Sequence, residues 1–171
     1  MRCADAIMHE LARHVDTVFY LPGGGCGPLV DALGQSGMQA VCCLHEQGAG
    51  YAAVGYSMLH GFGVCLTTSG PGATNAVTPC LAAYMDSIPV LFISGNVMRK
   101  WTAHGQRSRG VQEAPIEQIV APITKRVHRA AYGMGAVVAL QAMIALAQAG
   151  RPGPVWLDVP MDVQGEEVYD K

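Results

Sequence analysis

Short apolar runs alternate with segments of helical spacing along the chain. Runs rich in branched and aromatic residues predict strands at 17–21, 38–44, 64–68, 89–94 and 155–159. Apolar residues at helical spacing predict helices over 4–13, 28–33, from 46 onward, after 75 as far as 84, over 115–120 and over 132–149. Strands that alternate with helices are typical of a three-layer α/β/α fold with a mostly parallel sheet, here of about six strands.

The stretch 44–53 carries a single acid, Glu46, where the run 38–44 gives way to a helical pattern. The run predicts a buried strand, so Glu46 is expected at the carboxyl end of that strand and in the first turn of a helix. Ligands of open α/β sheets bind at this edge, and a helix N-terminus favours a carboxylate. Two interpretations stay open: Glu46 takes part in function, or it only caps the helix.

Three glycines, Gly48, Gly50 and Gly55, lie inside the helix that follows Glu46. Each glycine costs a helix interior about 0.5–1 kcal/mol relative to alanine. A helix with three of them is expected to have something close against its backbone. A cofactor, a partner chain or tight packing between helices would each satisfy that expectation.

The turns that follow three predicted strands are expected to meet at one edge of the sheet. They span 22–25, 45–48 and 69–75, and two of them are rich in glycine. The long irregular stretch 95–113 holds Arg99, Lys100, Arg107 and Arg109. Such a loop is either a solvated connection or a segment that faces an active site or a partner.

Composition excludes several classes of protein. Half of the 171 residues are hydrophobic, 14% are charged and the net charge is −2, which argues against a disordered chain or a nucleic-acid-binding protein. The uncharged run 130–150 is rich in alanine and predicts a packed helix rather than a membrane span. No signal-peptide pattern opens the chain, and the six cysteines form no CxxC pair, which favours reduced thiols and a cytoplasmic protein.

The motifs of common enzyme classes are missing. Residues 69–72, Ser-Gly-Pro-Gly, lack the Lys-Ser/Thr of a P-loop and the GxGxxG spacing of a dinucleotide fold. Backbone groups of this turn suit a flat heterocycle, with Asn75 as a polar anchor. The histidines show no metal-ligand spacing, no GxSxG is present, and His45 is expected to be structural. No metal site is predicted.

From about residue 5 to residue 164 the chain resembles the pyrimidine-binding (PYR) domain of thiamine diphosphate enzymes. It is most similar to the large subunit of acetolactate synthase. The matching stretches, in order, are 18–24 (VFYLPGG), 45–49 (HEQGA), 68–75 (TSGPGATN), 86–90 (DSIPV), 111–113 (VQE), 123–125 (ITK) and 150–155 (GRPGPV). The resemblance implies a PYR domain over 1–164, followed by a polar tail over 165–171.

The resemblance also implies roles for residues. Glu46 would hydrogen-bond N1′ of the aminopyrimidine of thiamine diphosphate and promote its imino tautomer, and Gln112 would line the substrate side as a second catalytic residue. The implied cofactor-binding residues are Pro22, Gly23, Glu46, Thr68, Pro71, Gly72 and Asn75. General acid–base chemistry of this kind needs a carboxylate held in place.

Departures from the family pattern limit what is carried over. Val111 stands where acetolactate synthases have phenylalanine, which predicts a wider pocket and an acceptor other than a second pyruvate. Ala121 replaces an arginine that often contacts FAD, and no middle domain is present, so FAD is not predicted. The GDG…NN pattern of the diphosphate-binding (PP) domain is also missing, so Mg²⁺ and the diphosphate are expected on a partner chain.

Two functions from different classes follow. The chain is either the PYR subunit or domain of a split enzyme that decarboxylates a pyruvate-like 2-oxo acid and ligates the product, or a non-catalytic assembly module or fragment. Its limits look like those of a complete PYR unit. The expected assembly is a homodimer or an α2β2-type complex with a PP-domain subunit, as in sulfopyruvate decarboxylase. No nucleic-acid or membrane partner is expected.

Overall fold

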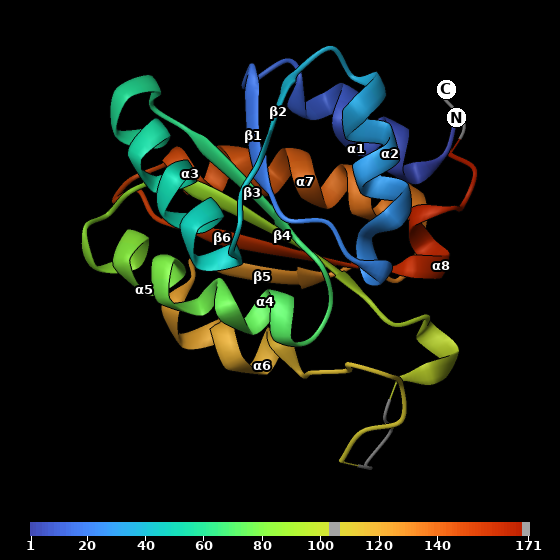
Figure 1. The fold of residues 1–171 in the computed structure, drawn as a ribbon. Coiled ribbons are helices and arrows are strands. Elements are labelled where there is room, and N and C mark those ends of the chain that lie inside the picture. The colour runs from blue at the N-terminus through green and yellow to red at the C-terminus, as the bar shows by residue number, and fades with distance from the viewer. Residues whose placement is uncertain (103–106, 169–171) are drawn as a thin grey trace.

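The sheet has six parallel strands, and a computed structural model describes it within residues 1–102 and 107–168. The strands are β1 (Thr17–Tyr20), β2 (Gln39–Cys42), β3 (Gly63–Thr67), β4 (Val90–Asn96), β5 (Arg126–Arg129) and β6 (Val155–Pro160). They lie in the order β2-β1-β3-β4-β6-β5 (Figure 1). This arrangement confirms the predicted α/β fold with a parallel sheet.

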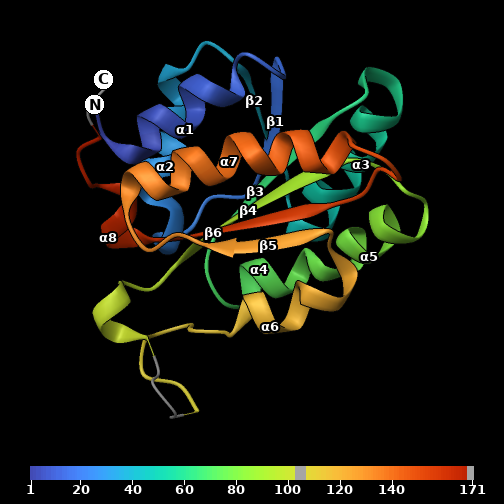
Figure 2. The ribbon, with the colours of Figure 1, turned by 180° about the vertical axis from the view of Figure 1, so that it is seen from behind.

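Helices cover both faces of the sheet, which completes the three predicted layers. On one face lie α1 (Cys3–Leu11), α2 (Gly27–Gln35), α7 (Gly133–Gln148) and α8 (Met161–Gln164). On the other lie α3 (Glu46–His60), α4 (Pro71–Asn75), α5 (Val77–Met85) and α6 (Ile116–Val120). Figures 1 and 2 show α1 and α7 above the sheet and α4, α5 and α6 below it.

Side chains alternate between two cores along the central strands. Leu91 and Ile93 pack toward α1 and α7, whereas Phe92 faces α3 and α5 and stacks on Trp156 with ring centroids 5.2 Å apart. Strands β3, β4 and β6 are buried along their whole length, because helices cover both of their faces. These are the strands whose continuous apolar runs predicted them from the sequence.

The elements at the margins depart from the predictions. The strand at 38–44 was expected to be buried, but β2 is an edge strand whose Gln39, Ala40 and Cys42 are exposed. The polar strand β5 and the short helix α8 had no element predicted for them. The helix expected after residue 75 is present as α5, but the turn predicted at 69–75 also contains a short helix, α4, which was not predicted.

The two ends of the described chain are joined. Arg2 forms an antiparallel bridge with Glu167, Cys3 N donates to Glu166 O at 2.7 Å, and Val168 is buried. The domain boundary at Gln164 stays a prediction, but residues 165–168 are not a free end. Within 1–102 and 107–168 no helix is both long enough and apolar enough to cross a membrane.

Candidate functional site

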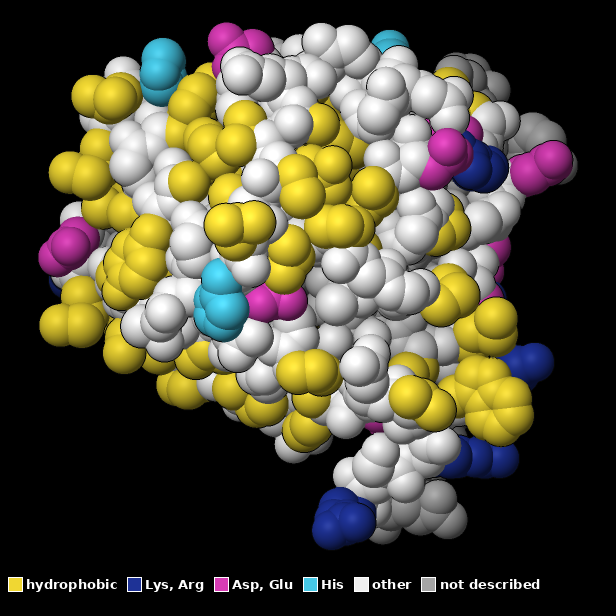
Figure 3. Space-filling model, viewed as in Figure 1, with side chains coloured by type: hydrophobic (Ala, Val, Ile, Leu, Met, Phe, Trp, Pro, Cys, Tyr) yellow, Lys and Arg dark blue, Asp and Glu magenta, His cyan; other side chains and the backbone are white. Residues whose placement is uncertain are grey.

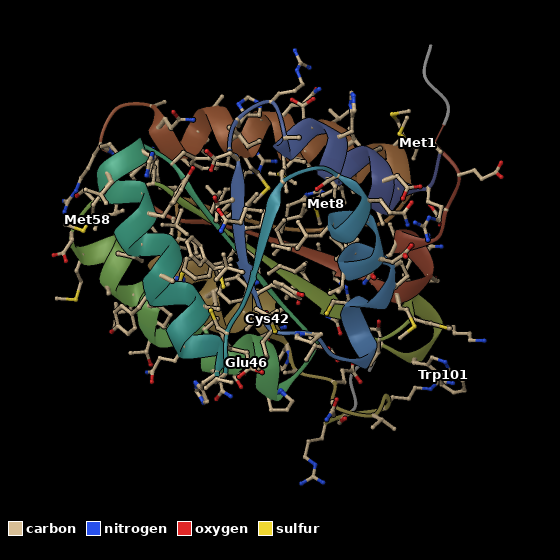
Figure 4. All side chains as sticks on the ribbon, turned by 45° about the horizontal axis from the view of Figure 1, so that its top comes forward. Met1, Met8, Cys42, Glu46, Met58 and Trp101 are labelled. Atoms are coloured by element: carbon tan, nitrogen blue, oxygen red, sulfur yellow. The ribbon has the colours of Figure 1, made fainter. Side chains whose placement is uncertain are left out.

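Glu46 is the first residue of α3, at the carboxyl edge of the sheet (Figure 4). His45 caps this helix, because its Nδ1 accepts a hydrogen bond from Gln47 N at 3.1 Å. This contact agrees with the structural role expected of His45. Only 8% of Glu46 is exposed, and its Oε2 accepts a hydrogen bond from Asn75 Nδ2 at 2.9 Å. Asn75, the last residue of α4, is itself exposed, so the pair lies at the protein surface.

A glycine brings the turn after β3 close to this carboxylate. A Cβ on Gly72 would lie 2.5 Å from Thr68 Cγ2 and 3.3 Å from Glu46 Oε1, so a side chain here would displace one of them. Gly70, which precedes α4, has a φ of 57°, a conformation that favours glycine. Within the described residues, Glu46 Oε1 accepts no hydrogen bond. That oxygen is available to a donor from outside the chain.

The turn after β1 packs against the same threonine. Gly25 N donates to Thr68 Oγ1 at 3.0 Å, and a Cβ on Gly23 would lie 2.5 Å from Thr68 Cβ. Pro22, just before Gly23, is exposed. The structure therefore confirms that the turns 22–25, 45–48 and 69–75 meet at one edge of the sheet.

Gln112 reaches this edge through its backbone. Its carbonyl oxygen lies against the α carbon of Gly70, where any side chain would collide with it. Gln112 has a φ of 58°, which is uncommon for a residue with a side chain, and its side chain is exposed. Val111 beside it is also exposed. The structure thus joins Glu46, Asn75, Gly72, Thr68 and Gly23 in one cluster. Gln112 lies next to it, Pro22 lies in the turn after β1, and Pro71 is the first residue of α4.

The family model of the thiamine pyrophosphate enzyme N-terminal TPP-binding domain matches residues 1–121. The chain belongs to this family. The acetolactate synthase large subunit of Corynebacterium glutamicum is 42% identical over 98% of this chain and 27% of its own length. Acetolactate synthase isozyme 2 large subunit of Escherichia coli is 39% identical over 96% of the chain and 30% of its own length. The recognition made from the sequence is confirmed, and the chain spans less than a third of these relatives.

The site suits the ring end of thiamine diphosphate. The exocyclic amino group and the ring nitrogens of a pyrimidine need nearby polar groups, and Glu46 offers a carboxylate oxygen without a protein donor. Gly23 and Gly72 remove the side chains that would otherwise fill the space around Thr68. For residues 1–102 and 107–168, no group of three or more histidine, cysteine or acidic side chains is placed to hold a metal ion.

Two buried thiols of this thiamine pyrophosphate enzyme domain, those of Cys65 and Cys80, are unsuited to act as nucleophiles. All six cysteines are free, and burial raises the pKa of Cys65 and Cys80, which lie on the α3 side of the sheet. A thiol with a raised pKa is a poor nucleophile at neutral pH.

Two residues that support the site were missed from the sequence. Gly95 in β4 leaves room for Gly25 O directly against its α carbon. Gln164, fully buried in α8, donates from Nε2 to Gly25 O at 2.7 Å and to Val159 O at 2.8 Å. A glycine at the end of an apolar strand is a usable signal for Gly95, whereas no local pattern points to Gln164.

Proposed function

We propose that this chain is the PYR part of a thiamine diphosphate-dependent enzyme of the acetolactate synthase type, acting on a pyruvate-like 2-oxo acid. The single observation that carries the proposal is the Glu46 carboxylate, held by Asn75 with one oxygen open at the carboxyl edge of the sheet. The reaction proposed is decarboxylation, followed by ligation of the product to an acceptor carbonyl. A PP-domain chain would supply the Mg²⁺ and diphosphate sites.

Thiamine diphosphate, when bound, supplies a carbon centre that takes up the electron pair left by loss of CO2. Glu46 Oε1 would hold a proton at N1′ of the pyrimidine, and Asn75 would fix the other oxygen so that the carboxylate keeps its orientation. Gly23, Thr68 and Gly72 would shape the pocket around the ring. Gln112, next to the exposed Val111, would face the substrate.

An exposed apolar face supports the need for a partner. Met58 and Leu59 of α3 are 71% and 84% exposed, and Met85 of α5 is 66% exposed. Hydrophobic side chains gather over α3 and α5 on the left of Figure 3. A patch of this kind marks a protein–protein contact in many proteins. We propose that the PP-domain chain covers it, within a homodimer or an α2β2-type assembly.

The surroundings of the α3 glycines distinguish tight helix packing from a partner chain as the reason for each glycine. Gly50 packs against α5, because Pro79 Cβ lies 2.8 Å from where its Cβ would be. Gly48 and Gly55 are exposed and have no atom of the chain within 4 Å of that position. Tight helix packing thus explains Gly50 but not the other two. Gly48, Gly55 and Met58 share one exposed face of α3, which fits a partner that approaches the helix backbone closely.

Replacing Gly55 by alanine is expected to stabilise the isolated chain and weaken its assembly. The free energy of unfolding should rise by about 0.5–1 kcal/mol, because alanine is the better helix former. The dissociation constant for the PP-domain chain should rise about tenfold or more, because a methyl group enters a close contact. Denaturant unfolding and calorimetric titration measure the two effects.

The control for this substitution is Gly34→Ala. Gly34 is also exposed inside a helix, α2, with no atom within 4 Å of a Cβ, but it lies on the opposite face of the sheet. It should stabilise the chain equally and leave the dissociation constant unchanged. Equal binding of both variants to the partner would show that the α3 face is not the contact.

Reconstitution tests the activity itself. The chain is mixed with a candidate PP-domain protein, thiamine diphosphate, Mg²⁺ and pyruvate, and CO2 release is followed. We expect release only when both chains are present, and poor cofactor binding by this chain alone. Micromolar calorimetric binding without a partner would contradict the division of the site between two chains. A stable complex with no turnover of any 2-oxo acid would favour the alternative, an assembly module.

A further inference from the structure

A buried polar cluster lies across the strands β4, β6 and β5, close to the proposed site. The sheet register aligns Ser94 with Asp158 and Asp158 with Arg129. Asp158 is fully buried, and its two carboxylate oxygens accept hydrogen bonds from Ser94 Oγ at 2.7 Å and Asn96 Nδ2 at 2.6 Å. Trp156 Nε1 donates to Ser94 Oγ at 2.9 Å. Arg129 Nε lies 3.8 Å from Asp158 Oδ2.

Such a cluster is a costly way to fill a core. A buried carboxylate loses its hydration, and well-packed apolar residues often stabilise a fold at least as well. Burial raises the pKa of Asp158 to about 7, and the nearby Glu117 adds to that rise, while Asn96, Ser94 and Arg129 oppose it. The cluster therefore needs an explanation other than stability, and its hydrogen bonds suggest one.

The bonds of the cluster converge on the connection between β4 and α6. At its start, Asn96 Oδ1 accepts a hydrogen bond from Val97 N at 2.8 Å. Further on, Arg129 Nη2 donates to Thr102 Oγ1 at 2.5 Å. At its end, Arg129 Nη1 donates to Glu117 Oε1 of α6 at 3.3 Å. Arg129 thus binds the first part of the connection, at Thr102, and its end, at Glu117. The connection itself extends away from the sheet in Figure 1.

Gln112 lies on this connection. Val97, whose backbone the cluster holds, packs on Gly110, where Val97 Cγ1 lies 2.7 Å from the place of a Cβ. The turn after it is closed by Glu113, which accepts hydrogen bonds from Arg109 N at 2.7 Å and Gly110 N at 3.0 Å. This turn presents Gln112 with its φ of 58° and sets its carbonyl against Gly70. Packing thus runs from Asp158 to Gln112 without a break.

We propose that Asp158 and Arg129 are positioning residues that set the place of Gln112 at the substrate side of the site. The role of Gln112 toward the substrate rests on the proposed function. The claim that Asp158 and Arg129 hold the turn 109–113 in place does not. Without Arg129 the two parts of the connection are held together by the packing of Val97 on Gly110 and no longer by hydrogen bonds to β5, so the turn 109–113 can shift relative to Gly70. A misplacement of about 1 Å costs on the order of a hundredfold in rate when a group must be oriented.

Hydrogen exchange of the chain tests whether Arg129 holds the turn 109–113 in place. In Arg129→Leu, exchange at the bonded amides of Arg109, Gly110 and Glu113 is expected to speed up about tenfold or more, while amides of β3 and β4 stay within about twofold of wild type. An equal increase in the strands and the turn would mean that Arg129 only stabilises the fold, and would overturn the proposal. Arg126→Leu, an exposed cation of the same strand, is the matched control and should change neither.

Kinetics of the reconstituted complex test the role of Gln112. In Arg129→Leu the KM for the 2-oxo acid is expected to rise about tenfold or more, with the dissociation constant for thiamine diphosphate within about twofold of wild type. Arg129→Lys keeps one charged donor and should give an intermediate KM. Faster exchange of the turn 109–113 together with an unchanged KM would overturn the proposal. A wild-type complex without turnover would instead reject the proposed function, and the exchange result would stand separately.

Discussion

Glu46→Gln is expected to lower kcat of the reconstituted enzyme by about 10²–10⁴-fold, the range for loss of a positioned acid–base group. The amide is nearly the same size, and its oxygen still accepts the hydrogen bond from Asn75 Nδ2. Its amide nitrogen can neither give a proton to N1′ of the pyrimidine nor take one back, as a carboxyl group does. The loss should therefore appear in turnover, measured as CO2 release at saturating 2-oxo acid, and not in folding.

Glu10→Gln is the matched control for this experiment. Glu10 is also 8% exposed, but it lies in α1 and pairs with His14 and Arg13, each at 3.2 Å. Burial raises the pKa of Glu10, but hydrogen bonds with His14 and Gln141 and the charge of Arg13 outweigh it, so the net shift is downward. Its loss should cost stability and leave turnover per folded molecule unchanged. Full activity in Glu46→Gln would end the proposed role of that carboxylate.

The fold was predictable where burial on both faces imposes a simple pattern. Strands β3, β4 and β6 carry continuous apolar runs, because helices cover each side of them. At the sheet edge that pattern fails. Strand β5 reads Arg-Val-His-Arg and has a single apolar residue, so nothing in its composition predicts a strand. Strand β2 was found from its apolar residues but wrongly taken as buried, because sequence does not show which strand lies at the edge.

The site was predictable in its parts and not in its contacts. The turn residues and Glu46 stand out in sequence, and parallel topology alone brings them to one edge. The contact of Gly70 with Gln112 joins residues 42 positions apart through backbone atoms, which no side-chain pattern records. The polar cluster gave one unused signal: Asp158 is a lone acid inside an apolar strand. Such a residue is expected to have buried partners, although the sequence does not identify them.

Asp158 should also make the stability of the chain depend on pH. Burial raises its pKa from an ordinary 3.8 to about 7, so the folded chain binds this proton more tightly than the unfolded chain does. The resulting stability is fully present below about pH 4 and is lost as the pH rises to about 7. Between about pH 5 and about pH 8 the loss is on the order of 3 kcal/mol, at about 1.4 kcal/mol per pH unit.

Asp158→Asn removes this proton and should remove that slope. Denaturant unfolding at several pH values gives the free-energy difference between variant and wild type, in which the contributions of other groups, such as the lowered pKa of His128, cancel. The difference is expected to move in favour of the variant as the pH rises through about 7. Asp162→Asn is the control of opposite sign: burial raises the pKa of Asp162, but the hydrogen bonds and charge of Arg99 outweigh it and lower the pKa overall. Its difference should change only at acidic pH, in favour of the variant as the pH falls. A difference for Asp158→Asn that stays constant from about pH 5 to about pH 8 would mean that the carboxyl group keeps its charge in the folded core, and that Arg129 and Asn96 compensate fully for its burial.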